Sequence, residues 1–230
     1  VRNRIVFTAH HTHLADGVPT PEIAAYYEAR ARGGAGLIVT EASAIHDSAY
    51  FAAHVIESHK PACIPGYRLI AEACHRHGTR VLGQLFHPGR ETRARRDSHI
   101  PIAWAPSAVP GERHHVMPRA MPVALVEEIV AGFGASAARL QAAGLDGVEI
   151  VASHGYLPAQ FLNPRANIRD DACGGSLDNR LRFLREVIEA VREQVGREFV
   201  VGLRISASEE ADDGLQIDEV LDALRALDAD

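Results

Sequence analysis

The chain has 230 residues, a length that suits one large domain or two small ones. With 47% hydrophobic and 23% charged residues, the composition is that of an ordinary globular protein and excludes a disordered one. The net charge of −6 comes from both signs mixed along the chain. This argues against a nucleic-acid binder, which needs a basic face.

Short apolar runs alternate with amphipathic segments along the chain. We expect strands at 5–8, 37–40, 81–85, 147–151 and 199–205, and helices at 21–32, 65–77, 123–143, 177–195 and 217–227. Gly78 should end the second helix in a left-handed conformation, and Ser176 should cap the fourth. Long irregular stretches lie at 88–121 and between the fourth strand and Gly175. This alternation predicts parallel strands joined by right-handed crossovers.

Such a run of units closes either as an open doubly wound sheet or as a barrel. No G-x-G-x-x-G follows the first strand, so the usual dinucleotide reason for an open sheet is absent. Both long loops follow strands, on the side where barrel enzymes build their sites. The pattern therefore favours a TIM (β/α)8 barrel, in a single domain over 1–230 that holds about five of the eight βα units. Neither end of the chain looks natural, so we expect a piece of a longer protein.

Three cysteines, Cys63, Cys74 and Cys173, lie far apart in the sequence without a C-x-x-C pair. We therefore expect neither a disulfide framework nor a zinc ribbon, and a cytoplasmic location. No apolar run reaches the ~18 residues of a membrane span, and no apolar leader opens the chain. The expected partner is a small-molecule substrate rather than a nucleic acid or a membrane, and a homo-oligomer is left open.

Unusual polar residues collect where the predicted strands end. They are His10, His11 and His13 after the first strand, Glu41 after the second, Gln84, His87 and Arg90 at the third, His154 and Tyr156 after the fourth, and Arg204 in the fifth. A closed barrel brings the carboxyl ends of its strands to one mouth, so we expect these side chains to share one active site.

Segments spread over the whole chain resemble one enzyme family. They are NRIV at 3–6, LIVTE at 37–41, QLFHPGR at 84–90, GVEIVASHGYL at 147–157, QFLNP at 160–164 and GGSLDNR at 174–180. In this order they resemble the Old Yellow Enzyme, or NADH:flavin oxidoreductase, family of FMN-binding TIM barrels. The segment TAHHT at 8–12 is similar to the large branch that includes 2,4-dienoyl-CoA reductases and trimethylamine dehydrogenases.

The resemblance implies an FMN cofactor and assigns residues to its ring. Ala9 and His11 match family positions against the ring and near its C4 carbonyl and N5, and Ala42 matches the isoalloxazine edge. Gln84 matches the glutamine at the pyrimidine side, and Arg204 the arginine beside N1 and the C2 carbonyl. A reduced flavin is negative near N1, so a fixed guanidinium there raises its electron affinity. The phosphate is normally gripped after strands seven and eight, which this chain lacks.

The resemblance also implies substrate residues. In many members two ring donors, three residues apart, grip the substrate's carbonyl oxygen while flavin N5 delivers a hydride. His154 occupies the second position, but the first is Val151, which donates nothing. Tyr156 matches a proton donor whose phenol, with a pKa near ~10, is a usable acid; His13 is assigned to substrate as well.

The missing donor disfavours simple enone reduction. It leaves NAD(P)H-dependent reduction of a dienoyl thioester, and amine dehydrogenation or demethylation, as the expected chemistries. In the large branch a 4Fe-4S cluster and a nucleotide domain follow the barrel. None of their cysteine motifs occur in this chain, so both are expected only beyond it.

Two other interpretations remain open. His11 and His13 form an H-x-H, which metal-dependent hydrolase barrels use for zinc. Two observations count against such a hydrolase: the only lysine, Lys60, lies in a loop, and no histidine follows the fifth strand. A non-catalytic barrel is the second alternative. For single residues, we expect Glu41 to tie backbone groups, His87 to brace its loop, and Gly174 and Gly175 to shape a helix start.

Overall fold

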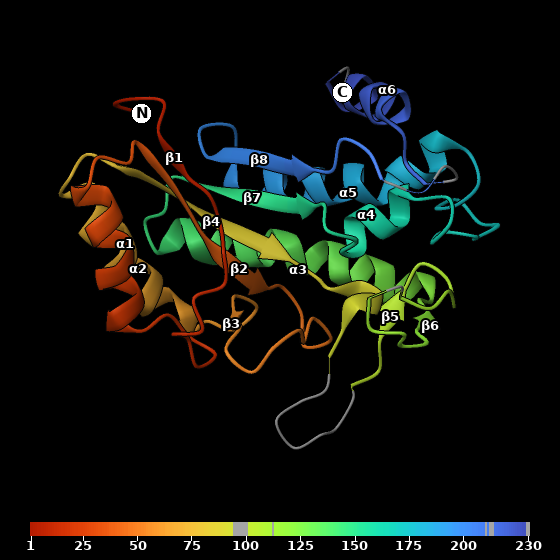
Figure 1. The fold of residues 1–230 in the computed structure, drawn as a ribbon, viewed down its shortest axis with the longest axis horizontal. Coiled ribbons are helices and arrows are strands. Elements are labelled where there is room, and N and C mark those ends of the chain that lie inside the picture. Colours follow the sequence, from red (N-terminus) through yellow and green to blue (C-terminus); the bar gives the residue numbers. More distant parts are fainter. Residues whose placement is uncertain (94–100, 112, 210, 212–213, 229–230) are drawn as a thin grey trace.

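The computed structural model describes residues 1–93, 101–111, 113–209, 211 and 214–228. Its main sheet is parallel and consists of β1 (Val6–Phe7), β2 (Leu37–Ala44), β4 (Arg80–Phe86), β7 (Gly147–Ala152) and β8 (Val200–Ile205), with β3 (Ile56–Glu57) paired to β2 at the side. Figure 1 shows β4, β7 and β8 side by side and pointing in one direction.

The strand order decides between the two closures left open by the sequence. The five principal strands are hydrogen-bonded in the order in which they occur along the chain, β1-β2-β4-β7-β8. A doubly wound sheet reverses its order at a switch point, whereas a TIM barrel does not. The chain therefore forms part of a TIM barrel, as predicted.

Four long helices connect the strands: α1 (Pro21–Arg32), α2 (Cys63–His75), α3 (Val123–Ala142) and α5 (Leu177–Val195). The helix α5 has the predicted bounds, and its first turn is capped by Ser176 Oγ, which accepts from the amide of Asn179. Gly78 has the predicted left-handed backbone, with a φ of 69°, although α2 ends before it at His75. The bounds of α2 and α3 lie close to those predicted, 65–77 and 123–143.

The strand β2 is longer than predicted because it contains an irregularity. Its register against β4 shifts between Val39 and Ala42, so Glu41 lies inside the strand rather than after it. The Glu41 amide donates instead to the hydroxyl of Tyr27 on α1, 2.7 Å away. An acidic residue and a bulge hide such a continuation from an apolar pattern.

The long loops also contain elements that the sequence did not predict. The stretch 88–121 holds the short helix η1 (Gly89–Glu91) and a two-stranded parallel sheet of β5 (Trp104–Ala105) and β6 (Arg119–Ala120). The helix α4 (Leu157–Leu162) follows β7 and was not predicted either, whereas α6 (Ile217–Asp228), after β8, matches the helix predicted at 217–227. Elements of two to six residues are too short to produce a hydrophobic period.

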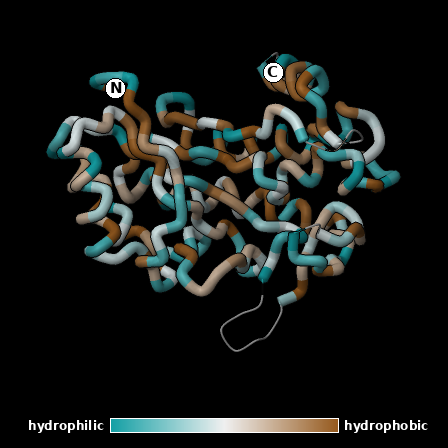
Figure 2. Tube along the Cα trace, viewed as in Figure 1, coloured by the Kyte–Doolittle hydropathy of each residue, from teal (hydrophilic) through white to brown (hydrophobic). Residues whose placement is uncertain are grey.

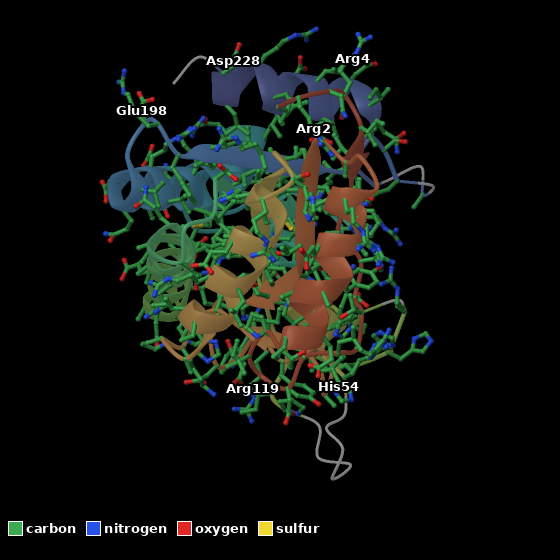
Figure 3. All side chains as sticks on the ribbon, turned by 90° about the vertical axis from the view of Figure 1, so that its left-hand side faces the viewer. Arg2, Arg4, His54, Arg119, Glu198 and Asp228 are labelled. Carbon is green, nitrogen blue, oxygen red and sulfur yellow. The ribbon has the colours of Figure 1, made fainter. Side chains whose placement is uncertain are left out.

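The core lies between the sheet and the helices that cover one of its faces. Phe161 on α4 and Phe183 on α5 stack with their ring centroids 4.2 Å apart, and both are fully buried. Figure 2 shows hydrophobic residues along the strands and hydrophilic ones on outer turns. In Figure 3 the exposed residues Arg4, Glu198 and Asp228 lie at the outer edge of the molecule. None of the described helices is long and apolar enough to cross a membrane.

Candidate active site

One pocket lies at the carboxyl ends of the strands. Its lining comprises Ala9, His10, His11, Ala42, Phe51, Val55, Gln84, Phe86, Val151, His154, Tyr156 and Arg204. Seven of these residues were predicted from the sequence for cofactor or substrate: Ala9, His11, Ala42, Gln84, His154, Tyr156 and Arg204. The structure therefore brings them to one place.

The register of the sheet explains this convergence. Ala42 on β2 pairs with Gln84 on β4, and Val151 on β7 pairs with Arg204 on β8. Residues paired across parallel strands lie at one level of the sheet, and residues two apart on a strand share a face. Side chains far apart in the chain therefore reach the same side of the sheet.

Arg204 has no protein partner in the part of the chain that the structure describes. Its guanidinium is half-buried and lines the pocket. A cation in this setting is best satisfied by an electron-rich group of a ligand. Beside it, Ala9 and Ala42 contribute small apolar side chains, which leave room for a flat ring.

Gln84 is oriented by a carboxylate on the next strand. Its Nε2 donates to Glu149 Oε1 over 2.6 Å, so the amide oxygen points away from β7. No donor among the described residues binds that oxygen. The acceptor oxygen of Gln84, the cation of Arg204 and the small side chains of Ala9 and Ala42 are complementary to an isoalloxazine ring. The residues present therefore fit FMN.

His154 and Tyr156 form a second group in the pocket. Their rings lie 5.9 Å apart between centroids, and Tyr156 packs edge-on against Phe51 and Phe86. Burial raises the pKa of Tyr156, which keeps its phenol protonated at neutral pH. Burial, with help from the charges of Arg204 and Arg113, lowers the pKa of His154, so its ring is neutral there.

The histidines after β1 contact each other and the neighbouring backbone. His11 Nε2 lies 2.9 Å from the carbonyl oxygen of His54, and the His11 ring stacks on His13 at 4.2 Å. Among residues 1–93, 101–111, 113–209, 211 and 214–228 no group of three or more His, Cys, Asp or Glu could hold a metal ion. The pair lies in a loop, since β1 ends at Phe7. His13, assigned to substrate from the sequence, is exposed and lies outside the pocket lining.

His87 and Glu41 brace the backbone around the pocket. His87 is fully buried, bonded to Ser48 Oγ at 2.9 Å and to the amide of Gly89 at 3.0 Å, and burial lowers its pKa to about 3. Gly89 has a φ of 61°, and a side chain there would collide with the amide of Gln160. Glu41 accepts from the amide of Thr12 at 2.8 Å. These contacts agree with the structural roles expected for both residues.

The model of one protein family matches residues 1–230, the NADH:flavin oxidoreductase / NADH oxidase family. This chain belongs to that family.

Similar proteins share the family and the fold. The chain is 37% identical over 227 residues to an N,N-dimethylglycine/sarcosine dehydrogenase of Chromohalobacter salexigens, covering 96% of this chain and 32% of that protein. A solved complex of 2-naphthoyl-CoA reductase is 26% identical with a TM-score of 0.93, over 100% of this chain and 37% of the other. Morphinone reductase with tetrahydroNAD is 31% identical with a TM-score of 0.87, over 99% and 67%.

Three apolar pocket residues of this NADH:flavin oxidoreductase family member were not predicted: Phe51, Val55 and Phe86. A signal existed for Phe86, because it stands two residues after Gln84 on a strand and therefore shares its face. Phe51 and Val55 lie in the irregular segment between β2 and β3, where no period applies. The family's motifs in this chain therefore mark the polar half of the pocket better than its apolar half.

Proposed function

We propose that this chain forms the flavin-ring half of an FMN-dependent oxidoreductase of the Old Yellow Enzyme type. The proposal is carried by one observation: the guanidinium of Arg204, without a partner among the described residues, lies in one pocket with the acceptor oxygen of Gln84. Arg204, Gln84, Ala9, Ala42 and His11 would hold the ring. When bound, FMN supplies the exchange of a hydride with a substrate.

The chain's own residues bind and protonate the substrate. The neutral ring of His154 offers one N–H to a polar group of the substrate, while Ser153 Oγ, 2.6 Å from Nδ1, holds the ring. The Tyr156 phenol delivers a proton to a basic carbon. Val151 is buried, and its side chain has no donor, so a carbonyl oxygen would be held at one point rather than two.

Two substrate classes suit this pocket. One is an N-methylated amine, as the name of the N,N-dimethylglycine/sarcosine dehydrogenase and that of a probable N-methylproline demethylase, 37% identical, suggest. The other is an unsaturated thioester, as for 2-naphthoyl-CoA reductase. NAD(P)H is the proposed electron donor in the reductive case, supported by morphinone reductase with its bound tetrahydroNAD. The metal-dependent hydrolase has no support from the family or the site.

The setting of the domain is also a proposal. We treat 1–230 as one partial barrel domain, and place any 4Fe-4S cluster outside it, because Cys63 and Cys74 are buried singly and Cys173 lies far along the chain. Free cysteines agree with the cytoplasm. The chain spans 32% of the dehydrogenase's length, so the activity of the whole protein rests on residues beyond it as well.

Anaerobic titration of the full-length natural protein tests the function. NADH, NADPH and N,N-dimethylglycine are added in turn while the visible absorbance of the bound chromophore is followed. The proposal predicts stoichiometric bleaching by a nicotinamide or by the amine. A protein that is not bleached by either, but is bleached by dithionite, would contradict both substrate classes.

A further inference from the structure

Two arginines of the loop after β4 stand near the pocket without a carboxylate partner. Arg93 and Arg113 are both exposed, and within the described ranges neither guanidinium is in an ion pair. Some other exposed arginines are in ion pairs, as Arg76 is with Glu28 at 3.0 Å and Arg80 with Asp146 at 2.6 Å. What distinguishes Arg93 and Arg113 is their place beside the pocket, near Tyr156 and His154.

Arg93 is held over the aromatic wall of the pocket. Its Cζ lies 4.6 Å from the ring centroid of Phe51, whose ring is 5.6 Å from that of Tyr156. Its Nε donates to His114 Nε2 over 3.1 Å, and its terminal NH2 groups have no hydrogen-bond partner in the part of the chain that the structure describes. The ring of Phe51 thus lies between the Arg93 guanidinium and Tyr156.

Arg113 lies near His154 and Tyr156 as well, in a neighbouring cavity. This cavity is lined by Arg113 with His154 and Gly155, and His154 also lines the main pocket, so the two spaces adjoin. Arg90 and Arg165 lie in the same wall.

Two carboxylates, those of Glu91 and Glu209, also line this cavity. Glu91 lies 3.9 Å from Arg90 Nε, and Glu209 accepts from Asn163 Nδ2 over 2.6 Å. Within the described ranges, neither carboxylate forms an ion pair with Arg113. The charges of Arg113 and Arg93 also oppose the larger effect of burial on the pKa of Tyr156, which places both within electrostatic range of it.

We propose that Arg93 and Arg113 bind a carboxylate of the substrate beside His154 and Tyr156, and that the enzyme selects small carboxylate-bearing amines. The inference rests on the proposed function, because it assumes that His154 and Tyr156 face the reacting carbon. Arginine binds carboxylates through paired N–H donors. A small amino acid carries its carboxylate only a few bonds from the reacting carbon. This short separation suits guanidinium groups that lie close to Tyr156. The phosphates of a CoA thioester, by contrast, lie at the far end of a long flexible arm, so they suit cations close to the reacting carbon less well.

Matched substrate pairs test the proposal on the full-length protein. N,N-dimethylglycine is compared with trimethylamine, sarcosine with dimethylamine, and N-methylproline with N-methylpyrrolidine; each pair differs only by the carboxylate. Dissociation constants come from perturbation of the bound chromophore's spectrum, and limiting rates from rapid-mixing reduction. We expect the carboxylate member to bind about tenfold tighter or better in at least one pair.

Variants assign that preference to the two arginines. Arg113→Met and Arg93→Met should each weaken carboxylate binding about 10- to 100-fold, leaving the decarboxylated partner and the limiting rate unchanged. Arg113→Lys should restore part of the affinity, because it keeps the charge. Arg119→Met, an exposed arginine of the same long loop, is the control and should change nothing.

The outcomes separate this inference from the proposed function. A full-length protein without FMN would sink both. A protein that carries FMN and is reduced by NAD(P)H, but whose carboxylate preference is absent or survives in the Arg93→Met/Arg113→Met double variant, would overturn the carboxylate site alone. Tight binding of crotonyl-CoA that depends on Arg113, with no binding of the amino acids, would overturn it as well.

Discussion

Gln84 on β4 and Glu149 on β7 are register partners, and Gln84 Nε2 donates to Glu149 Oε1 over 2.6 Å. An ionised carboxylate accepts but does not donate, so this contact fixes which end of the Gln84 amide faces the pocket. The pocket is offered an acceptor, which is what the N–H of a flavin pyrimidine ring requires. Glu149 therefore fixes the orientation of Gln84 without lining the pocket itself.

Glu149→Gln should weaken FMN binding. An amide at 149 can donate or accept, so Gln84 loses its fixed orientation, and we expect the dissociation constant to rise about tenfold. Fluorescence quenching of FMN by the apoprotein measures it. Glu193→Gln, at an exposed position of α5, is the control. An affinity that is the same in both variants would mean that Glu149 only stabilises the sheet.

Arg204→Ala should lower the midpoint potential of the bound cofactor and slow its reduction. The guanidinium stabilises the negative charge of the reduced form, and losing such a preorganised group costs roughly 10²–10³ in rate. Arg204→Lys should retain part of the potential. Spectroelectrochemical titration measures this, and an unchanged potential in Arg204→Ala would refute the role of Arg204.

Tyr156→Phe should separate the two halves of the catalytic cycle. The phenol stays protonated because burial raises its pKa, so it serves as an acid only when a carbon is protonated. Reduction of the cofactor should keep its rate, whereas reduction of an unsaturated thioester should slow by about 10²- to 10⁴-fold. Equal slowing of both half-reactions, followed by rapid mixing, would show that Tyr156 is structural.

Val151→His should add the absent ring donor beside His154. Val151 is 1% exposed and lines the pocket, so a histidine there would displace apolar contacts with Phe86 and lower stability somewhat. We expect NAD(P)H-driven reduction of cyclohexenone to rise above that of the natural protein. Val151→Leu keeps the site apolar and should show no gain. Absence of activity in a folded, FMN-loaded Val151→His variant would place the limiting difference elsewhere.

Asp146 should contribute stability that depends on pH. Burial raises its pKa, but hydrogen bonds from the Val81 amide at 2.8 Å, His75 at 2.8 Å and Arg80 at 2.6 Å outweigh burial and hold the pKa below its ordinary value. Because the folded pKa is depressed, the stabilisation is present above the unfolded pKa of ~3.9 and is lost as the pH falls through the folded value.

We therefore expect Asp146→Asn to lower the free energy of unfolding by about 1–2 kcal/mol at pH 7. The difference from the natural residue should shrink below pH ~4. Urea unfolding at several pH values measures both quantities. Asp178→Asn, whose side chain is 73% exposed, serves as the control. A difference that persists unchanged at low pH would rule out the ionised carboxylate as its source.

The long elements were predictable because each carries its own signal. The helix at 177–195 has a serine cap and a long amphipathic pattern, and its bounds were predicted correctly. The strand β2 was predicted too short because its continuation contains Glu41 and a register shift, where the Glu41 amide donates to the hydroxyl of Tyr27. That compensation depends on packing between distant residues, which a local pattern does not contain.

The residues of the pocket also divide into those that the sequence predicts and those that it does not. Motif residues such as Gln84 and Arg204 were placed at strand ends by pattern and resemblance, and the register brings them together. Phe51 was missed because it comes from an irregular segment. His13 stays outside the pocket lining, although its ring stacks on that of His11, which belongs to the lining.

The identity of the chromophore in the full-length natural protein tests the account most directly. The purified protein is denatured in acid, and the released small molecule is identified by its absorbance and its mass. We predict FMN in about one equivalent per chain, and its loss or weakening in the Glu149→Gln and Arg204→Ala variants. A colourless protein that cannot be reconstituted with FMN would contradict the central claim.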